Sequence, residues 1–235
     1  ADQIKVDYTG TSFVIHSSHL IPQTLKVKIL LVGKHFAHAA LVAAAVGWIQ
    51  GLTPKEIVSG LSKLEPLVGR MSIEKGPLET ILLNDALRAN PASTMAGLET
   101  LSALPARGRR VAVLGEMGEL GDFAEAGHRQ IGQKVADLKI DFLVSIGPLQ
   151  RFTAEEAIKN GMKKENVFWV KDVAAAADTL RGILKKDDLL YLKGSLLRHL
   201  ERVVLLLRGE RVDCLAVSCH NYDQCPECPQ LRKLS

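Results

Sequence analysis

The sequence predicts an α/β fold whose core is a mainly parallel sheet of about five to six strands, with helices on both faces. Two observations lead to this prediction. From about residue 79 onward, short runs rich in Val, Ile and Leu alternate with segments whose apolar residues recur at spacings of three and four. Such strand–helix repeats give parallel strands, because each helix carries the chain back to the start of the next strand. The chain has 235 residues, 47% of them hydrophobic, which is enough for a packed core.

Five segments have the composition of buried strands, and a helical pattern follows each of them. The strand segments are apolar through their interior, as strands covered on both faces are. The expected strands are 79–85, 109–117, 141–147, 166–172 and 187–195. The expected helices are 92–104, 125–139, 153–162, 173–184 and 196–208.

The first 70 residues follow a different pattern and are too few for an independent domain with a large core. One helix start is well marked, because Thr53 can cap it, Pro54 suits its first turn and Glu56 completes a capping box. The elements expected in this region are strands 11–17 and 25–32, a turn near Ile21, and helices 36–50 and 53–64.

Composition excludes several classes of function. The net charge is +4 with Lys and Arg scattered along the chain, and 5% of residues are aromatic, so we expect no nucleic-acid partner. The longest apolar stretch, 39–49, is too short to span a membrane. The first residues lack the basic and then apolar build of a signal peptide, so we expect a cytoplasmic protein.

The segment 115–121, GEMGELG, follows the second predicted strand of the α/β region, where open sheets of this kind bind ligands. Its glycines, at steps of three, allow a ligand to approach the backbone. Glu116 and Glu119 would repel a phosphate, and the spacing is not that of a dinucleotide-binding loop. A cationic amine or a metal fits this loop better.

The run 111–121, VAVLGEMGELG, with His128 downstream, resembles the LGDMxELG…H signature of the Mur ligase family, the ATP-dependent amide-forming enzymes of peptidoglycan synthesis. Further motifs extend the resemblance to about residue 212. They are Gly33-Lys34-His35 against the family's G-(R/K)-H-N, Gly69-Arg70-Met71 against GRM, residues 84–93 against DDSYNANPAS, and Lys193-Gly194-Ser195 against KGSR.

The resemblance implies a division of the chain into three parts. Residues 1–70 would be the C-terminal remnant of the family's central, ATP-binding domain, and 71–212 its Rossmann-like C-terminal domain. Residues 213–235 would form a cysteine-rich tail that the resemblance does not cover.

The resemblance also implies roles for individual residues. Arg70 and Lys193 would be catalytic, with Arg70 also bracing ATP phosphates. The other nucleotide contacts would be His35, Asp85 and Asn90, and the substrate contacts Glu116, Glu119, Lys193 and Ser195. The two glutamates would receive an incoming ammonium, while Lys193 and Ser195 would steady a substrate carboxylate, helped by the N-terminus of the following helix.

The resemblance of the acidic loop implies the family activity that adds D-alanyl-D-alanine to UDP-N-acetylmuramoyl-tripeptide, with ATP and Mg²⁺. No G-x-x-x-x-G-K-[ST] phosphate loop occurs in the sequence, so we expect a C-terminal half that is inactive alone. We also expect a monomer. Another Mur-type or folylpolyglutamate-like ligase is one alternative. A non-catalytic α/β binding domain is a second, and departures from the family motifs favour it, at Phe36, Ala39, Leu87, Arg88 and Leu196.

Several motif residues also have an ordinary structural interpretation. Asp85 and Lys193 could be polar residues at strand ends, since strand-to-helix junctions favour capping side chains. His35 could be a cap or a packed histidine, and His128 a residue on a helix face.

The four cysteines of the chain all lie between residues 214 and 228. Cys225 and Cys228 have the C-x-x-C spacing that lets two sulfurs bind one tetrahedral ion. Cys214, with Cys219 or His220, could supply the remaining ligands of a structural Zn²⁺. A disulfide, or a disordered or redox-active tail, is the alternative.

Overall fold

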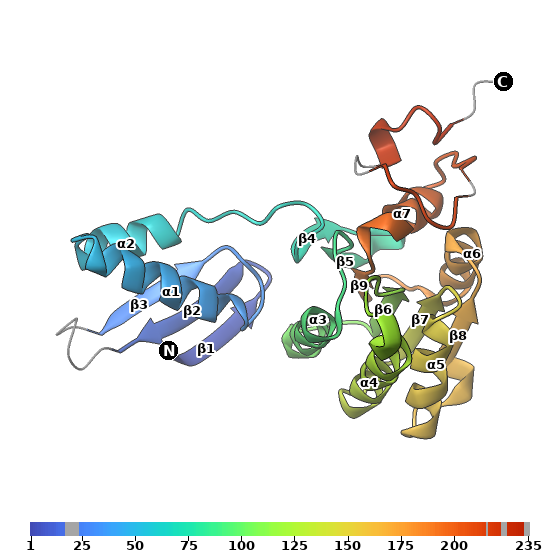
Figure 1. The fold of residues 1–235 in the computed structure, drawn as a ribbon, viewed down its shortest axis with the longest axis horizontal. Coiled ribbons are helices and arrows are strands. Elements are labelled where there is room, and N and C mark those ends of the chain that lie inside the picture. The colour runs from blue at the N-terminus through green and yellow to red at the C-terminus, as the bar shows by residue number, and fades with distance from the viewer. Residues whose placement is uncertain (17–23, 215, 222–224, 233–235) are drawn as a thin grey trace.

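The computed structural model describes residues 1–16, 24–214, 216–221 and 225–232, which form two lobes (Figure 1). In the smaller lobe, three antiparallel strands form a sheet in the order β1–β2–β3. Two helices pack on this sheet, where Ala40 and Ile57 join the same core as Phe13 and Val27. The elements of this lobe are β1 (Asp2–Asp7), β2 (Gly10–Ile15), β3 (Leu25–Ile29), α1 (Phe36–Ile49) and α2 (Pro54–Leu61).

The strands and helices expected in this lobe are confirmed, and β1 is an addition. Almost every residue of β1 is exposed, so this strand has no buried face that an apolar pattern could reveal. The expected turn near Ile21 lies outside the described residues. The capping box of α2 is present, because Thr53 Oγ1 accepts from Glu56 N at 3.3 Å and Glu56 Oε2 accepts from Thr53 N at 2.8 Å.

The larger lobe is built on a six-stranded sheet in the order β4–β5–β9–β6–β7–β8. Every neighbouring pair is parallel except β4 and β5, which confirms the predicted sheet. The short antiparallel edge strand β4 was not expected, and its ends carry polar and charged residues. The strands are β4 (Ser72–Lys75), β5 (Ile81–Asp85), β6 (Arg110–Gly115), β7 (Phe142–Ile146), β8 (Val167–Val170) and β9 (Leu189–Lys193).

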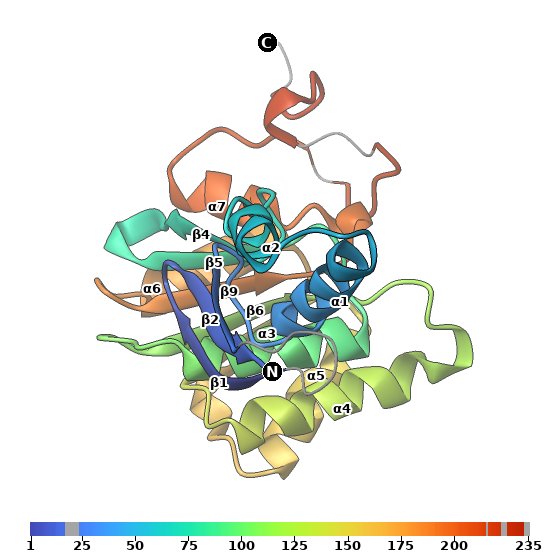
Figure 2. The same ribbon diagram turned by 90° about the vertical axis from the view of Figure 1, so that its left-hand side faces the viewer.

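Helices cover both faces of this sheet (Figures 1 and 2). Successive strand residues point to opposite faces, so Leu83 and Tyr191 meet one layer of helices while Leu82 and Leu190 meet the other. No helix in the described part of the chain has the length and apolarity to cross a membrane. One layer holds α3 (Pro91–Ala103), α4 (Ala124–Asp137) and α5 (Gln150–Lys159), and the other holds α6 (Val173–Ile183) and α7 (Glu201–Leu207).

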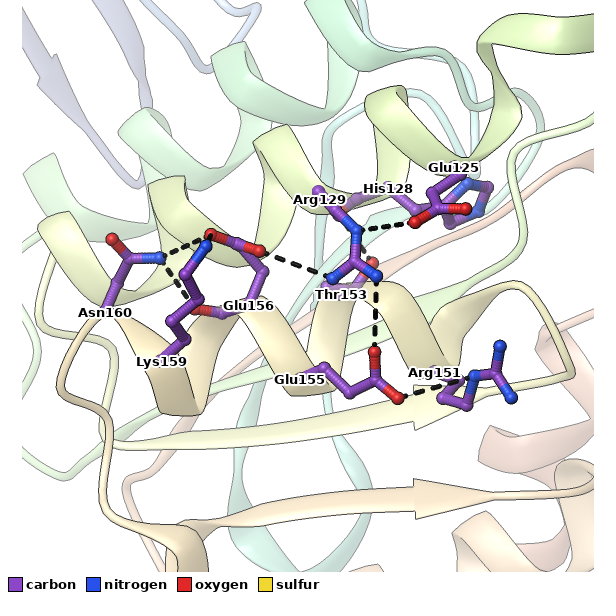
Figure 3. Close-up of polar contacts among 9 residues, drawn as sticks. All are labelled: Glu125, His128, Arg129, Arg151, Thr153, Glu155, Glu156, Lys159 and Asn160. Atoms are coloured by element: carbon purple, nitrogen blue, oxygen red, sulfur yellow. Dashed lines mark hydrogen bonds and ion pairs between the residues drawn. The ribbon is translucent and has the colours of Figure 1, made fainter.

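The helices α4 and α5 pack closely beside the loop that follows β6. A Cβ at Gly132 of α4 would lie 2.3 Å from the backbone oxygen of Thr153, so only glycine permits this approach. Figure 3 shows Arg129 of α4 reaching across to Glu155 and Glu156 of α5, with N–O distances of 3.4 Å. These pairs are partly exposed and add little stability each. The backbone contact therefore does most to fix the two helices.

The prediction of one continuous helix over 196–208 is wrong. Leu196–Arg198 form a single 3-10 turn, and His199 then adopts a left-handed conformation with φ 48°. A left-handed residue cannot continue a right-handed helix, so α7 begins only at Glu201. The Lys193-Gly194-Ser195 motif is therefore not at an α-helix N-terminus, and no helix dipole assists Lys193 there.

The strand order reverses at the carboxyl edge of the sheet, and we call the region outside these strand ends the crevice. After β8 the chain returns to the middle and inserts β9 between β5 and β6. Open α/β sheets bind ligands where the strand order reverses in this way. The two lobes meet beside this edge at α3, where Val32 packs in the core of Leu98 and Lys34 Nζ lies 2.6 Å from Glu99 Oε2.

Candidate functional site

Asp85 and Lys193 form a buried ion pair at the carboxyl ends of β5 and β9. The two residues are opposite each other in the parallel register, and Lys193 Nζ lies 2.5 Å from Asp85 Oδ2. Only 6% of Asp85 and 2% of Lys193 is exposed. The Tyr191 hydroxyl also donates to Asp85 Oδ2 at 3.3 Å, and Lys193 Nζ donates to the Arg88 carbonyl at 2.9 Å.

A glycine on the neighbouring helix makes room for Tyr191. A Cβ at Gly97 of α3 would lie 1.8 Å from the Tyr191 hydroxyl oxygen. The helix can thus approach the sheet closely enough to bury Tyr191 completely against Asp85. Neither Gly97 nor Tyr191 was singled out from the sequence, because their relation depends on the distance between a helix and a strand.

Burial and charge act in opposite directions on the ion pair. Burial raises the pKa of Asp85, while the Lys193 charge and the hydrogen bonds from Lys193 and Tyr191 oppose that rise. Burial lowers the pKa of Lys193, and Asp85 opposes that change. The positive charge of Arg70 favours ionised Asp85 and disfavours charged Lys193, so Arg70 lies close enough to act on both groups.

Arg70, in the segment between α2 and β4, and His35, in the smaller lobe, lie near the same pair. Arg70 is exposed, between α2 and β4. His35 is half-buried, and burial, followed by the Lys193 charge, lowers the pKa of its ring. Its buried Nδ1 atom has no hydrogen-bond partner among the described residues. The structure therefore brings His35, Arg70, Asp85 and Lys193 within electrostatic reach of one another, and their roles stay predictions.

Asn90 has a local structural role. Its Oδ1 accepts a hydrogen bond from Ser93 N at 2.8 Å, and Ser93 Oγ accepts from Asn90 N at 3.2 Å. These two bonds make a capping box at the start of α3. The Asn90 side chain is exposed at the carboxyl edge of the sheet, with its oxygen engaged by the helix.

The two glutamates of the loop after β6 lie in different environments. Glu116 is buried, with Oε2 2.7 Å from Arg198 Nη2 and Oε1 accepting from Leu149 N at 2.8 Å. A Cβ at Gly147 would lie 2.8 Å from Glu116 Cδ, so that glycine makes room for the carboxylate. Glu119 is exposed and has a positive φ of 61°. The accessible carboxylate of the loop is thus that of Glu119.

His128 of α4 holds the loop after β6 in place through a buried hydrogen bond. The Met117 N–H donates to His128 Nε2 at 3.2 Å, so Nε2 is unprotonated and Nδ1 donates to the Ala124 carbonyl at 2.7 Å. The side chain is fully buried, and burial lowers the pKa of the ring. His128 is therefore a buried contact between α4 and the loop, where the sequence suggested only a residue on a helix face.

The loops after β6 and β9 touch each other. Ser195 N donates to the Glu116 carbonyl at 3.0 Å, and a Cβ at Gly118 would lie 3.4 Å from Ser195 Oγ. A cavity of about 250 Å³ lies beside this junction, with Glu116, Arg198 and Lys171 in its wall. Glu116 thus contacts Ser195 through its backbone and lines this cavity, which Ser195 and Lys193 do not line.

The four cysteines belong to the tail beyond α7, and one of them, Cys214, also lines the cavity of about 250 Å³. Cys214, Cys219, Cys225 and Cys228 are all free thiols and line one small cavity, which His199 also lines. In the part of the chain that the structure describes, the compact group of possible metal ligands is His199, Glu201 and Cys225, whose ligand atoms lie within 4.8 Å of one another. His220 is exposed.

Comparisons with known proteins identify relatives of this chain. A family model described as Mur ligase, glutamate ligase domain, matches residues 69–196. The UDP-N-acetylmuramoyl-tripeptide--D-alanyl-D-alanine ligase of Bacillus subtilis (strain 168) is 32% identical over 195 residues, which are 83% of this chain and 41% of that enzyme. The ligase of the same name from Escherichia coli (strain K12) is 34% identical over 147 residues, 63% of this chain and 31% of that enzyme. The chain therefore spans less than half the length of these relatives.

Solved structures with the same fold carry related names. Crystal structure I of MurF from Acinetobacter baumannii has a TM-score of 0.75 at 23% identity, over 88% of this chain and 44% of that one. The MurF ligase from Thermotoga maritima in complex with ADP has a TM-score of 0.72 at 19% identity, over 89% of this chain and 45% of that one. At these identities the likeness shows a shared fold.

Proposed function

Because this chain belongs to the Mur ligase family, we propose that it is the C-terminal part of a ligase that adds D-alanyl-D-alanine to UDP-N-acetylmuramoyl-tripeptide. The observation that carries the proposal is the crevice where the buried Asp85–Lys193 pair and the Glu116/Glu119 loop lie at adjacent strand ends, in a chain whose curated relatives bear this name. We assign residues 1–70 to the end of the central domain, 71–212 to the C-terminal domain and 213–235 to the tail.

The reaction has two steps. ATP transfers its γ-phosphoryl group to the terminal carboxylate of the tripeptide, giving an acyl phosphate and ADP. The free amine of D-alanyl-D-alanine then attacks the acyl carbon, an amide forms, and inorganic phosphate leaves with the electrons of the broken C–O bond. The task of the protein is to position the reactants and stabilise the negative charge, while Mg²⁺ bound with ATP neutralises phosphate charge.

The residues of the crevice fit one side of a nucleotide and an acyl phosphate. Arg70 is an exposed cation that can brace phosphate oxygens, and His35 and Asn90 are the further polar contacts that we propose. Asp85 accepts from Lys193 and Tyr191 at Oδ2, which fixes the orientation of its carboxylate toward the nucleotide. Lys193 ends β9 and Ser195 follows it, and both steady the substrate carboxylate. We propose Arg70 and Lys193 as the catalytic residues.

The acidic loop receives the amine. Glu119 is accessible and can hold an ammonium until it loses its proton, and Glu116 shapes the loop while paired with Arg198. Of the two glutamates, only Glu116 lines the neighbouring cavity of about 250 Å³. The exposed carboxylate of Glu119 is the feature that favours an amine substrate over a second phosphate compound.

The experiment that tests the proposal uses the protein of which this chain is the C-terminal part. ATP- and Mg²⁺-dependent coupling of D-alanyl-D-alanine to UDP-N-acetylmuramoyl-tripeptide is the expected result. Coupling of a single amino acid such as glutamate instead would point to another Mur-type or folylpolyglutamate-like ligase. Binding of nucleotide without coupling of any amine would point to a non-catalytic α/β domain, which the departures at Ala39 and Leu196 favour.

The proposal places this reaction in the cytoplasm and involves a monomeric chain and no nucleic acid. The Zn²⁺ expected in the tail would be structural. It would take no part in this reaction, and its ligands would be residues outside the crevice.

A further inference from the structure

All four cysteines of the chain meet at one cavity between α7 and the tail. This cavity has a volume of about 40 Å³ and is also lined by His199 and Arg202. A space of this size holds an ion or a water molecule but not an organic ligand. Its lining combines sulfur and imidazole nitrogen, the donors that zinc prefers in structural sites.

His199 is held in the orientation of a metal ligand. Its ring is 1% exposed, and Nδ1 donates to Glu201 Oε1 at 2.8 Å. The other nitrogen, Nε2, is buried and has no hydrogen bond of normal geometry within the described residues, although the Asn221 carbonyl approaches the ring. Histidines that bind metals commonly donate their second nitrogen to a carboxylate in this way. The unpartnered Nε2 therefore points to a missing ligand.

Cys219, Cys225 and Cys228 all line the cavity that His199 lines. Cys225 Sγ belongs to the group within 4.8 Å that includes His199 and Glu201, and the sulfurs of Cys219 and Cys228 lie outside that group. Asn221 connects two others, because its N–H donates to Cys219 Sγ at 3.4 Å and its Nδ2 donates to Cys228 Sγ at 3.9 Å. Asn221 therefore holds these two cysteines close to each other.

The fourth cysteine is engaged by a buried arginine. Arg202 is 2% exposed, and Nη1 contacts both the Cys214 carbonyl at 3.1 Å and Cys214 Sγ at 3.7 Å. Its other hydrogen bonds are to backbone carbonyls, and no carboxylate lies within ion-pair distance in the described chain. A buried cation without an anion is costly. A zinc ion with three thiolates and a neutral imidazole has one net negative charge and would compensate Arg202.

We propose that this cavity binds one structural Zn²⁺ through the Sγ atoms of Cys219, Cys225 and Cys228 and the Nε2 atom of His199. Each of the three thiols loses its proton to solvent when its sulfur binds the metal. Cys214 lies outside the coordination sphere, held by Arg202. Four protein ligands leave no open position, so the ion fixes the tail to α7 and takes no part in catalysis.

This ligand set differs from the sets that the sequence suggested, which were the four cysteines or three of them with His220. His199 precedes the tail, has a left-handed backbone and lines the cavity. The proposal does not depend on the ligase activity. An ion bound to His199 would also restrain the preceding residue, Arg198, which pairs with Glu116.

Metal analysis of the whole chain, purified without chelator, tests the proposal. We expect one zinc per chain, and zinc X-ray absorption of the unmodified protein should show three sulfurs near 2.3 Å, as is typical of Zn–S bonds, and one nitrogen. Absence of zinc together with full reactivity of all four thiols in the native protein would overturn the proposal. Disulfide bonds in the protein as purified would overturn it equally.

Matched variants test the choice of ligands. Cys225→Ser and His199→Asn should lose the zinc, whereas Cys214→Ser should retain it. Far-UV circular dichroism should show that the α/β fold remains in each variant. Retention of zinc in His199→Asn with loss in Cys214→Ser would show a four-cysteine site and contradict this ligand set. The absorption spectrum of the unmodified protein makes the same distinction if a variant fails to fold.

Discussion

Lys193 Nζ lies 2.5 Å from Asp85 Oδ2 across two adjacent parallel strands, and less than a tenth of either side chain is exposed. The two residues are far apart in the chain, and the pair exists because β9 inserts next to β5. Two charges that have left water are stable only when each neutralises the other. Each charge therefore depends on the other to remain buried in the folded protein.

Removal of one member of this pair should be strongly destabilising. Lys193→Met or Asp85→Ala leaves an uncompensated buried charge, and we expect a loss of about 3–5 kcal/mol in the free energy of unfolding. The double variant Asp85→Ala/Lys193→Met should lose less than the sum of the single variants, because neither charge remains. Urea unfolding curves measure these values.

The exposed pair of Lys186 and Glu79, with an N–O distance of 2.9 Å, is the control. Lys186→Met should hardly change the unfolding midpoint, since solvent screens both charges. Effects as small at Asp85 and Lys193 would contradict the picture of a coupled buried pair. In the full ligase, Asp85→Ala should mainly weaken the use of nucleotide and Lys193→Ala should lower the rate with the peptide substrate.

Acid should weaken the fold through Asp188, which is almost fully buried. Burial opposes its charged form, but hydrogen bonds from the Arg109 side chain and backbone, and from Lys185 N, hold its pKa below the usual 3.8. Because the folded-state pKa is below that of the unfolded chain, this stabilisation is complete above pH 3.8 and is lost as the pH falls through the folded-state value. Unfolding free energies measured below pH 5 should show this loss, and Asp188→Asn should remove it. An unchanged acid profile in that variant would contradict the assignment.

His128 should hold the acidic loop in place. His128→Leu leaves the buried Met117 N–H without its acceptor, which we expect to cost about 1–3 kcal/mol of stability. The same substitution at the exposed His38 should change stability by less than about 0.5 kcal/mol. Hydrogen exchange should report faster exchange at Met117 N in His128→Leu alone. Equal protection in both variants would show that the loop does not depend on this contact.

Much of the larger lobe could be predicted because its strands are buried on both faces. Leu82, Leu83 and their neighbours give an unbroken apolar run, and the helix periodicity that follows is equally clear. The crevice followed from the same reasoning, since polar residues at the ends of apolar strands must meet at one edge of a parallel sheet.

Other features depended on three-dimensional contacts that no local pattern records. The pairing of Glu116 with Arg198 joins two loops distant in sequence. The break in the predicted 196–208 helix comes from the backbone of His199, a residue type that carries no strong stop signal. The position of His199 beside the tail cysteines was also not predicted. The cysteine spacing alone suggested a complete set of ligands.

The two loop glutamates should differ in their effects on the proposed reaction. Glu119→Gln should raise the Michaelis constant for D-alanyl-D-alanine much more than that for ATP, by an amount that corresponds to roughly 1.5–3 kcal/mol for a charge-assisted hydrogen bond. Glu116→Gln should also weaken the pairing with Arg198 and so lower the stability of the loop. Unchanged dipeptide dependence in both variants would show that the glutamates only shape the loop.

The isolated chain should fold without catalysing ligation. Arg70 and Asp85 can contact only one side of a nucleotide, and no phosphate-binding loop of the G-x-x-x-x-G-K-[ST] type occurs in the sequence to grip the phosphates. Circular dichroism should show the α/β fold, and a phosphate-release assay should show no turnover with either peptide substrate. ATP-dependent amide formation by this chain alone would refute the expectation.

Gly97 should be indispensable for the closeness of α3 to Tyr191. A Cβ at this position would lie 1.8 Å from the Tyr191 hydroxyl and 2.4 Å from its ring, so Gly97→Ala forces the helix or the ring to move. We expect a loss of about 1–3 kcal/mol in unfolding free energy, typical of overpacking. Gly182 of α6 is the matched control, because a Cβ there would meet nothing within 4 Å. Gly182→Ala should instead stabilise the protein by about 0.5–1 kcal/mol through helix propensity. Thermal melts of the two variants should therefore shift in opposite directions, and a shared direction would show that the contact between α3 and β9 is looser than these distances imply.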